Sequence, residues 1–462
     1  MQNCFVKTAK NTVVIETVYD GEFKKWVKKQ TDRQQNWMTD TGFNGEKTAI
    51  CLIPDAKSHL KKIVFYMSGE KQKGIYDWAK LPGLLPELTG RIYEFSGLGR
   101  DDLKNAVMGW GLAEYRFDRY KTSKKIKPKQ LLWPDVDLMS VDQSLSASHL
   151  VRDLINTPAR DLGPEQLAAA AVDLCNRHKA KCDILVGDQL LQNNYPAIHV
   201  VGGGANRAPR LIDMKWGYGN NPKLTLVGKG VCFDTGGLDL KSAAHMKLMK
   251  KDMGGAAHVL GLASMIMAAG LPVRLRVLIP AVENSVSANA YRPSDIIPSR
   301  KGLNIEVNNT DAEGRIVLAD ALAAASEDNP DLIIDFATLT GAARVALGTD
   351  LPALFSNNDN VQNSIVSISK QINDALWPLP LWAGYDGQVD GQIGDVDNAP
   401  EGGYAGAITA ALFLKRFVER TIDWVHIDVM AWNLKTTPGR PQGGEAMGMR
   451  GVFAYIKDRY AK

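Results

Sequence analysis

The chain has 462 residues, more than one compact core usually contains, so its length predicts two or three domains. Hydrophobic residues make up 45% and charged residues 23%, a balance that excludes a disordered or fibrous protein. The net charge of +4 is too small for a protein whose main task is to bind nucleic acid.

Residues 1–135 predict a small α/β domain. Short apolar runs at 13–15, 50–53 and 62–66 have the composition of strands, and residues 103–117 have the periodicity of a helix. This part carries no concentrated group of polar residues. We therefore expect it to be non-catalytic and to serve oligomer assembly or regulation.

A basic linker follows. Residues 121–129 contain five lysines in nine positions, which predicts a solvated loop, with a phosphate-contacting patch as the alternative. Apolar residues then recur at helical spacing over 140–156, so we expect a linking helix within residues 136–160. Another helix begins near Pro164, because proline is tolerated in a first turn, and it opens a second domain at 161–462.

In the second domain, short β-rich runs alternate with longer helical runs. The predicted strands are 197–201, 224–227, 274–281, 304–307, 332–336 and 424–429. The predicted helices are 256–269, 314–325 and 408–420. This alternation predicts an α/β fold whose central sheet is mixed, largely parallel and flanked by helices. In such sheets the functional groups lie beyond the carboxyl ends of the strands.

Three features concern the cellular compartment. The longest apolar run, 256–273, contains a histidine, two glycines and a proline, and predicts a buried helix rather than a membrane span. The first residues lack the basic and then apolar order of a secretory signal. The five cysteines include no Cys-x-x-Cys pair, which fits a reducing compartment. We expect a cytoplasmic protein without a membrane partner.

Two common kinds of site are not supported. Residues 228–230, Gly-Lys-Gly, resemble the end of a phosphate-binding loop, but Lys223 replaces the first glycine and Gly230 replaces the Ser or Thr. The glycines at 202–204 follow the predicted strand 197–201 without the spacing of a dinucleotide site. The seven histidines form no His-x-x-x-His pair, so we do not expect imidazole to bind a metal.

The informative pattern is acidic. Asp311 and Glu313 follow the predicted strand 304–307, lie two residues apart and precede Arg315. Crowding two carboxylates at the mouth of a parallel sheet is costly without a cation. The alternative is a surface N-cap with an ion pair.

A second group of charged residues favours a metal site. Lys229 and Asp234 follow the predicted strand 224–227, Lys241 comes seven residues later, and Asp252 precedes the predicted helix 256–269. Carboxylate ligands without cysteine or histidine suit Mg²⁺, Mn²⁺ or Zn²⁺. Bridging carboxylates favour a site with two metals.

These residues resemble a known family. The segment 309–315, Asn-Thr-Asp-Ala-Glu-Gly-Arg, is similar to the signature of the leucyl aminopeptidases, the cytosol aminopeptidases of peptidase family M17. Residues 280–284 and 335–342 also match the family, as do the spacings of the charged residues above. The resemblance covers about 140–462, whereas the first 130 residues resemble the family only in size and position.

The resemblance implies a dinuclear metal site, in which Asp234 and Glu313 bridge two ions. The ions would be Mn²⁺ or Zn²⁺, with Mg²⁺ as an alternative. The implied ligands are Lys229, Asp234, Asp252, Asp311 and Glu313.

The resemblance also implies the activity. Lys241 would stabilise an oxyanion, and Arg315 would bind a bicarbonate that transfers a proton. Met249, Thr338 and Gly341 would line the pocket for an apolar first side chain such as leucine. We expect an aminopeptidase that hydrolyses peptide substrates with a metal-bridged water as nucleophile and assembles as a homohexamer.

Two other functions remain open at this point. A dipeptidase of the same fold, acting on cysteinyl-glycine, would differ only in the shape of its pocket. A nucleic-acid-binding regulator would use residues 121–129, although the weak net charge makes nucleic acid an unexpected partner.

Overall fold

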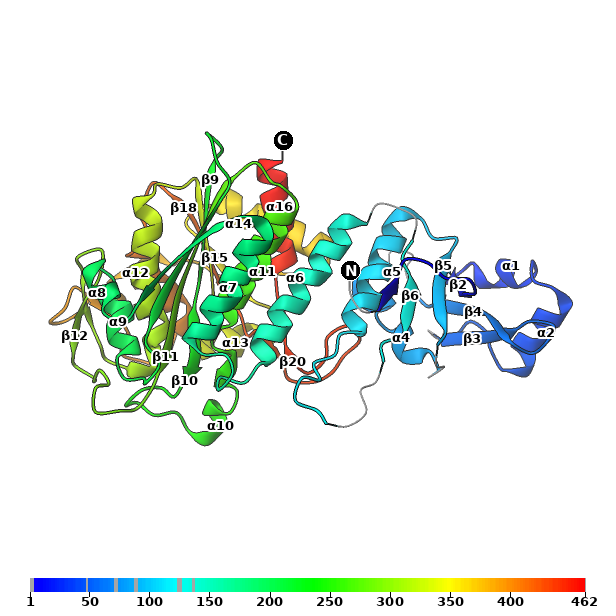
Figure 1. The fold of residues 1–462 in the computed structure, drawn as a ribbon, viewed down its shortest axis with the longest axis horizontal. Coiled ribbons are helices and arrows are strands. Elements are labelled where there is room, and N and C mark those ends of the chain that lie inside the picture. The colour runs from blue at the N-terminus through cyan, green and yellow to red at the C-terminus, as the bar shows by residue number, and fades with distance from the viewer. Residues whose placement is uncertain are drawn as a thin grey trace. The chain divides into compact units, whose positions relative to one another are not determined.

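The computed structural model describes residues 4–46, 49–69, 74–86, 90–122, 127–134 and 138–461. The chain forms two compact units (Figure 1), an N-terminal unit of residues 1–149 with 435–441 and a C-terminal unit of 150–434 with 442–462. The predicted fold class, a two-domain α/β protein, is confirmed. The return of 435–441 to the N-terminal unit is not visible in the sequence.

The N-terminal unit contains a six-stranded sheet in the order β1-β6-β5-β2-β4-β3, in which only the β3–β4 pair among the described strands is antiparallel. The strands are β1 (Phe5–Val6), β2 (Val13–Tyr19), β3 (Ala49–Pro54), β4 (Leu60–Met67), β5 (Ile92–Ser96) and β6 (Gln130–Leu132). The helices are α1 (Phe23–Val27), α2 (Asp32–Asp40), α3 (Ile75–Trp78), α4 (Leu81–Leu84) and α5 (Arg100–Ala113). The three strands predicted here and the helix α5 are confirmed, although α5 ends four residues earlier than predicted.

The predicted linker and linking helix are described only in part. Residues 123–126 of the lysine-rich stretch and residues 135–137 lie outside the described residues. The linking helix is α6 (Met139–Asn156), and the boundary between the two units falls within it.

The C-terminal unit is built on a nine-stranded mixed sheet whose main path is β16-β15-β18-β14-β9-β11-β8-β7, with β10 paired to β11. The central strands β18, β14, β9 and β11 are parallel, as the sequence predicts. The strands are β7 (Lys181–Val186), β8 (Arg210–Trp216), β9 (Lys223–Gly228), β10 (Gly230–Asp234), β11 (Arg274–Asn284), β14 (Leu332–Ala337), β15 (Ala353–Ser356), β16 (Trp377–Pro378) and β18 (Asp423–Asp428). Smaller sheets contain β12 (Ile296–Pro298), β13 (Asn304–Glu306), β17 (Val396–Asp397), β19 (Trp432–Asn433) and β20 (Gly443–Gly444).

Helices flank this sheet, and α11 and α12 both contact β9 (Figure 1). The helices are α7 (Pro164–His178), α8 (Gln189–Gln192), α9 (Pro196–Gly202), α10 (Ala243–Met246), α11 (Gly254–Ala268), α12 (Glu313–Glu327), α13 (Gly341–Leu347), α14 (Asp359–Gln371), α15 (Gly406–Lys415) and α16 (Met449–Tyr460). Three 3-10 turns are η1 (Met249–Lys251), η2 (Thr310–Ala312) and η3 (Ala383–Val389). Helix α11 is buried on nearly every side, as its apolar sequence predicts. Among the described helices, none is long and apolar enough to cross a membrane.

One predicted strand is wrong. Residues 197–201 form helix α9, and the glycines at 202–204 therefore follow a helix. Pro196 fixes a helical φ at the first position, and the carboxylate of Asp320 accepts the Ala197 and Ile198 amides at 2.9 and 3.3 Å. This cap comes from the distant helix α12 and is not visible in the local sequence. The short apolar run considered by itself therefore predicts a strand.

We predict that a buried ion pair within the C-terminal unit stabilises the fold. Arg152 on α6 donates from Nε and Nη2 to the two carboxylate oxygens of Glu445, each at 3.0 Å, and both side chains are almost completely buried. Arg152→Met leaves a buried carboxylate without its main cation and should cost about 3–5 kcal/mol. Calorimetric melting of this variant and of Arg152→Met/Glu445→Leu provides the measurement. The single variant should melt at the lower temperature, and the reverse order would contradict the prediction.

Candidate metal centre

Lys229 lies between β9 and β10, and its backbone groups form hydrogen bonds with two different elements, β14 and α11. Its N–H donates to Phe336 O at 3.0 Å, and its carbonyl accepts the Ala256 N–H at 2.8 Å. A Cβ on Gly228 would lie 2.5 Å from a methyl carbon of Val259, so the neighbouring helix requires glycine there. Close packing, rather than phosphate binding, thus explains the glycines on either side of Lys229.

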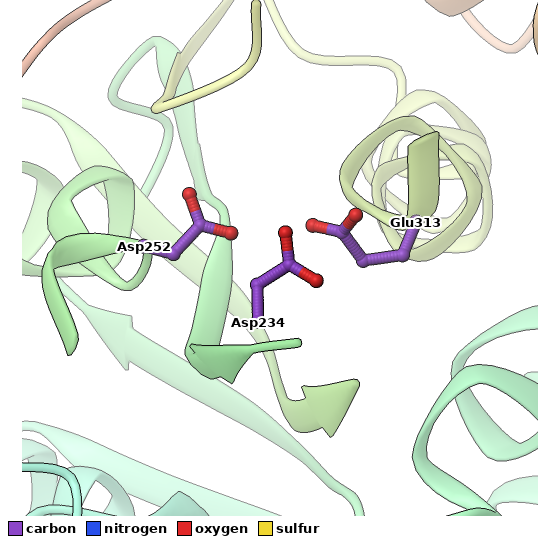
Figure 2. Close-up of side chains that lie close together, drawn as sticks. All are labelled: Asp234, Asp252 and Glu313. Atoms are coloured by element: carbon purple, nitrogen blue, oxygen red, sulfur yellow. The ribbon is translucent and has the colours of Figure 1, made fainter. Parts of the chain in front are cut away.

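Three carboxylates converge from separate elements. Asp234 ends β10, Asp252 follows η1, and Glu313 is the first residue of α12. Each is 1–3% exposed. One oxygen from each lies within 4.8 Å of the others, and Figure 2 shows the three side chains directed toward one another.

Two lysines compensate this negative charge. Lys229 Nζ lies 2.7 Å from Asp252 Oδ2 and 2.8 Å from Glu313 Oε1. Lys241 Nζ lies 2.8 Å from Asp234 Oδ2 and also contacts the carboxylate of Asp311. The structure therefore brings together all five predicted ligands and Lys241.

The alternative of a surface N-cap is wrong for Glu313, which is 1% exposed. The η2 turn is capped by Asn309, whose side-chain oxygen accepts the Asp311 amide at 2.7 Å. Arg315 is buried and donates from Nη1 to Asn398 O at 2.6 Å, rather than forming the expected surface ion pair.

The electrostatics show that negative charge is in excess. Burial, together with the charge of Asp234, raises the pKa of Glu313 well above its ordinary value. The same two causes raise the pKa of Asp311 to about 6. Burial on its own would lower the pKa of Lys229, but the charges of Asp252, Glu313 and Asp234 outweigh it and raise that pKa.

The donor set fits a divalent metal. Asp252 Oδ2 and Glu313 Oε1 are buried and, among the described residues, make ion pairs with Lys229 but no hydrogen bond. Such oxygens keep lone pairs that a cation can use. Several carboxylates with one amine, and no thiolate or imidazole, suit Mg²⁺, Mn²⁺ or Zn²⁺.

Two residues that support the carboxylates had no role assigned from the sequence. Asn284 Nδ2 donates to Asp234 Oδ1 at 2.8 Å and to Thr310 O at 3.0 Å. Tyr291 donates its hydroxyl to the same Thr310 carbonyl at 2.8 Å. The position of Asn284 at the end of β11, in register with Asp234, is the signal that could have identified it.

Of the three predicted pocket residues, Met249 and Thr338 contact Asp252, and Gly341 lies three residues after Thr338. Thr338 donates from Oγ1 to Asp252 Oδ1 at 2.8 Å, and Met249 O accepts the Asp252 amide at 3.2 Å. Gly341 begins α13 and is exposed, and a Cβ there would have no described atom within 4 Å.

Arg315 Nε is buried without a hydrogen-bond partner among the described residues, so it has a donor free for an anion.

Comparisons with known proteins agree with this arrangement. Residues 149–453 match the family described as "Cytosol aminopeptidase family, catalytic domain". Residues 13–134 match "M17 aminopeptidase, N-terminal domain". The similarity to the family therefore includes most of the first 130 residues, for which the sequence patterns predicted a resemblance only in size and position.

Individual relatives cover most of the chain. A probable cytosol aminopeptidase of Syntrophotalea carbinolica is 44% identical over 363 residues, which are 74% of this chain and 72% of that protein. Peptidase B of Yersinia pestis is 40% identical over 375 residues, which are 78% of this chain and 86% of that protein.

Solved structures are similar over almost the whole chain. A cytosol aminopeptidase from Coxiella burnetii has a TM-score of 0.93 and 44% identity, and the match covers 99% of this chain and 100% of that one. The bottromycin maturation enzyme BotP, solved in complex with Mn, has a TM-score of 0.86 and 27% identity, with 97% and 99% covered.

We predict that the centre requires glycine at position 314. A Cβ on Gly314 would lie 2.5 Å from Lys229 Cε and 2.7 Å from Nζ, so Gly314→Ala should displace that side chain. Mn²⁺ affinity, measured by titration calorimetry, should fall about tenfold or more, although alanine favours a helix over glycine by about 1 kcal/mol. Gly341→Ala, in the first turn of another helix with open space around it, is the matched control and should keep its affinity. Equal affinities in the two variants would contradict the prediction.

Proposed function

Because the chain belongs to the cytosol aminopeptidase family, peptidase family M17, and is a metal-dependent aminopeptidase, we propose that two divalent ions act in its active site. The observation that supports this most directly is the convergence of Asp234, Asp252 and Glu313 within 4.8 Å, next to Lys229. Lys241 brings Asp311 to the same centre. Aminopeptidases are among the hydrolases that use pairs of metal ions held by such carboxylate clusters.

We assign the ligands as follows. Asp234 and Glu313 would be shared by the two ions, Asp311 would complete one site, and Lys229 with Asp252 would complete the other. The amine of Lys229 must lose its proton to bind. The charges of Asp252, Glu313 and Asp234 raise its pKa, and cations held by those carboxylates would offset this effect. Mn²⁺ is the first metal to test, because one structural relative was solved in complex with Mn.

The remaining residues serve the hydrolysis of the first peptide bond. When bound, the two ions supply Lewis-acid chemistry that polarises the scissile carbonyl and makes a water molecule nucleophilic at neutral pH. Lys241 stays protonated, since the charges of Asp234 and Asp311 outweigh its burial and raise its pKa, and it stabilises the charge that develops on the carbonyl oxygen. Arg315, whose Nε is free, would hold a bicarbonate, and this ion would supply proton-transfer chemistry beside the leaving amine.

We infer the substrate class from the same residues. A free α-amine would bind at the metal site, which restricts cleavage to the first residue of a peptide. Met249, Thr338 and Gly341 would form the side-chain pocket and favour an apolar residue such as leucine. The relatives named Peptidase B make other first residues worth including in a substrate panel.

We also propose that the enzyme works in the cytoplasm as a homohexamer. The name of the relatives supports the compartment. Large apolar side chains on the C-terminal unit, Val345 at 90% and Tyr404 at 93% exposed, support a surface that another copy covers.

Metal content and activity should change together. We expect active protein to contain two divalent ions per chain and to hydrolyse leucine amide, to lose both properties on chelation, and to regain both with Mn²⁺ or Zn²⁺. Elemental analysis beside steady-state kinetics measures this. A fully active protein with one ion per chain or none would refute the dinuclear proposal.

The two lysines should respond differently to truncation. Lys241→Ala should lower kcat by about 10²–10³ with little loss of metal affinity, because Lys241 acts on the transition state. Lys229→Ala should lose metal affinity first, because Lys229 is assigned as a ligand. Titration of chelator-treated protein, run beside kinetics at saturating Mn²⁺, separates the two effects. Loss of metal in Lys241→Ala and retention in Lys229→Ala would reverse the assignment.

A further inference from the structure

Asp428 is a buried carboxylate near the metal centre that has no role in the proposal above. It is the last residue of β18, is 3% exposed, and pairs in register with Ala337, the last residue of β14. The chain leaves β14 through residues 338–340 and enters α13 at Gly341. Asp428 thus lies beside the start of this loop.

The carboxylate of Asp428 binds the loop through both oxygens. Oδ1 accepts the Leu339 amide at 2.9 Å, and Oδ2 accepts the Thr340 amide at 3.0 Å and the Thr340 hydroxyl at 2.6 Å. Arg344 Nη2, 3.6 Å from Oδ1, balances the charge. Hydrogen bonds to an ionised acceptor are about twice as strong as neutral ones, so they hold a loop more firmly.

The same loop contacts two of the assigned metal ligands. Thr338 donates from Oγ1 to Asp252 Oδ1 at 2.8 Å and lies 3.0 Å from Asp252 O. Its carbonyl accepts from Lys229 Nζ at 3.1 Å. A shift of the loop would therefore move Lys229 and Asp252 together.

We propose that Asp428 is a positioning residue that fixes the geometry of the site formed by Lys229 and Asp252. This inference rests on the proposed function, which assigns those two residues as ligands of one ion. Asp428 acts through Thr338 and touches neither ligand in the described contacts.

The effect should fall on one of the two ions. Asp234 is held instead by the Gly236 amide and by Asn284 Nδ2, each at 2.8 Å, and neither contact involves the loop. Weakening the loop should leave the site completed by Asp311 almost unchanged.

Asp428→Asn tests the proposal with little change in volume. An amide has a single acceptor oxygen, and its NH₂ would face a backbone N–H, so one end of the loop loses its partner. Asp374→Asn is a matched control. Asp374 is also buried beside an arginine, Arg450 at 3.5 Å, and accepts backbone amides at 2.7–3.2 Å, but it holds the start of α16.

Two measurements do not depend on the activity of the metal-loaded enzyme. In titration calorimetry of chelator-treated protein with Mn²⁺, Asp428→Asn should weaken one binding step 10–100-fold and leave the other within about threefold. In hydrogen exchange of the chelator-treated protein, residues 338–343 should lose protection. Asp374→Asn should do neither, even if both variants melt at similarly lowered temperatures.

The outcomes separate this inference from the proposed function. If the wild-type protein binds two ions and Asp428→Asn keeps both affinities, or loses no more than Asp374→Asn, the positioning role is refuted and the proposed function stands. If the wild-type protein binds fewer than two ions, the proposed function itself fails. Non-additive losses in Asp428→Asn/Thr338→Val would support the route through Thr338.

Discussion

The main physical constraint on the C-terminal unit is the mutual repulsion of its buried carboxylates, which the rest of the unit must compensate. Asp234, Asp252 and Glu313 come close enough that their charges cannot coexist in a medium of low dielectric without cations. Lys229 and Lys241 supply two positive charges against the four carboxylates of Asp234, Asp252, Asp311 and Glu313. The centre therefore carries excess negative charge, which favours the binding of cations.

The fold offsets part of this cost. Glu313 is the first residue of α12, and Asp252 lies two residues before the start of α11, so both carboxylates stand near helix N-termini, where the helix dipole favours negative charge. Parallel central strands place the residues that follow β9 and β14, Lys229 and Thr338, at one edge of the sheet, whereas Glu313 follows β13 of a smaller sheet. The absence of a side chain at Gly314 leaves room for Lys229 between the helix and the sheet.

Residues assigned to metal support and to the substrate pocket lie together in one segment, 338–341. Thr338 orients Asp252 and accepts from Lys229, while Gly341, three residues later, is assigned to the pocket. A mutation that moves Thr338 would change metal affinity, whereas a substitution at Gly341 would change only side-chain preference. Family members that differ in preference would therefore be expected to keep the buried contacts of Thr338 and to vary the exposed side of the loop.

The charged residues of the centre and the four parallel strands β9, β11, β14 and β18 could be predicted from the sequence. Segment 309–315 and the charged residues that follow β9 are local patterns. The rule for parallel sheets places the residues after β9 at one edge of the central sheet, whereas Asp311 and Glu313 follow β13, a strand of a smaller sheet, and reach the centre through tertiary packing. The packing of distant segments makes residues 197–201 a helix, because their cap is Asp320, 123 residues away. It also decided that Arg315 binds Asn398 O, and that Asp428 holds the loop after β14. Strand ends and residue types are properties of a short segment, whereas a hydrogen-bond partner from a distant segment exists only once the loops have packed against each other.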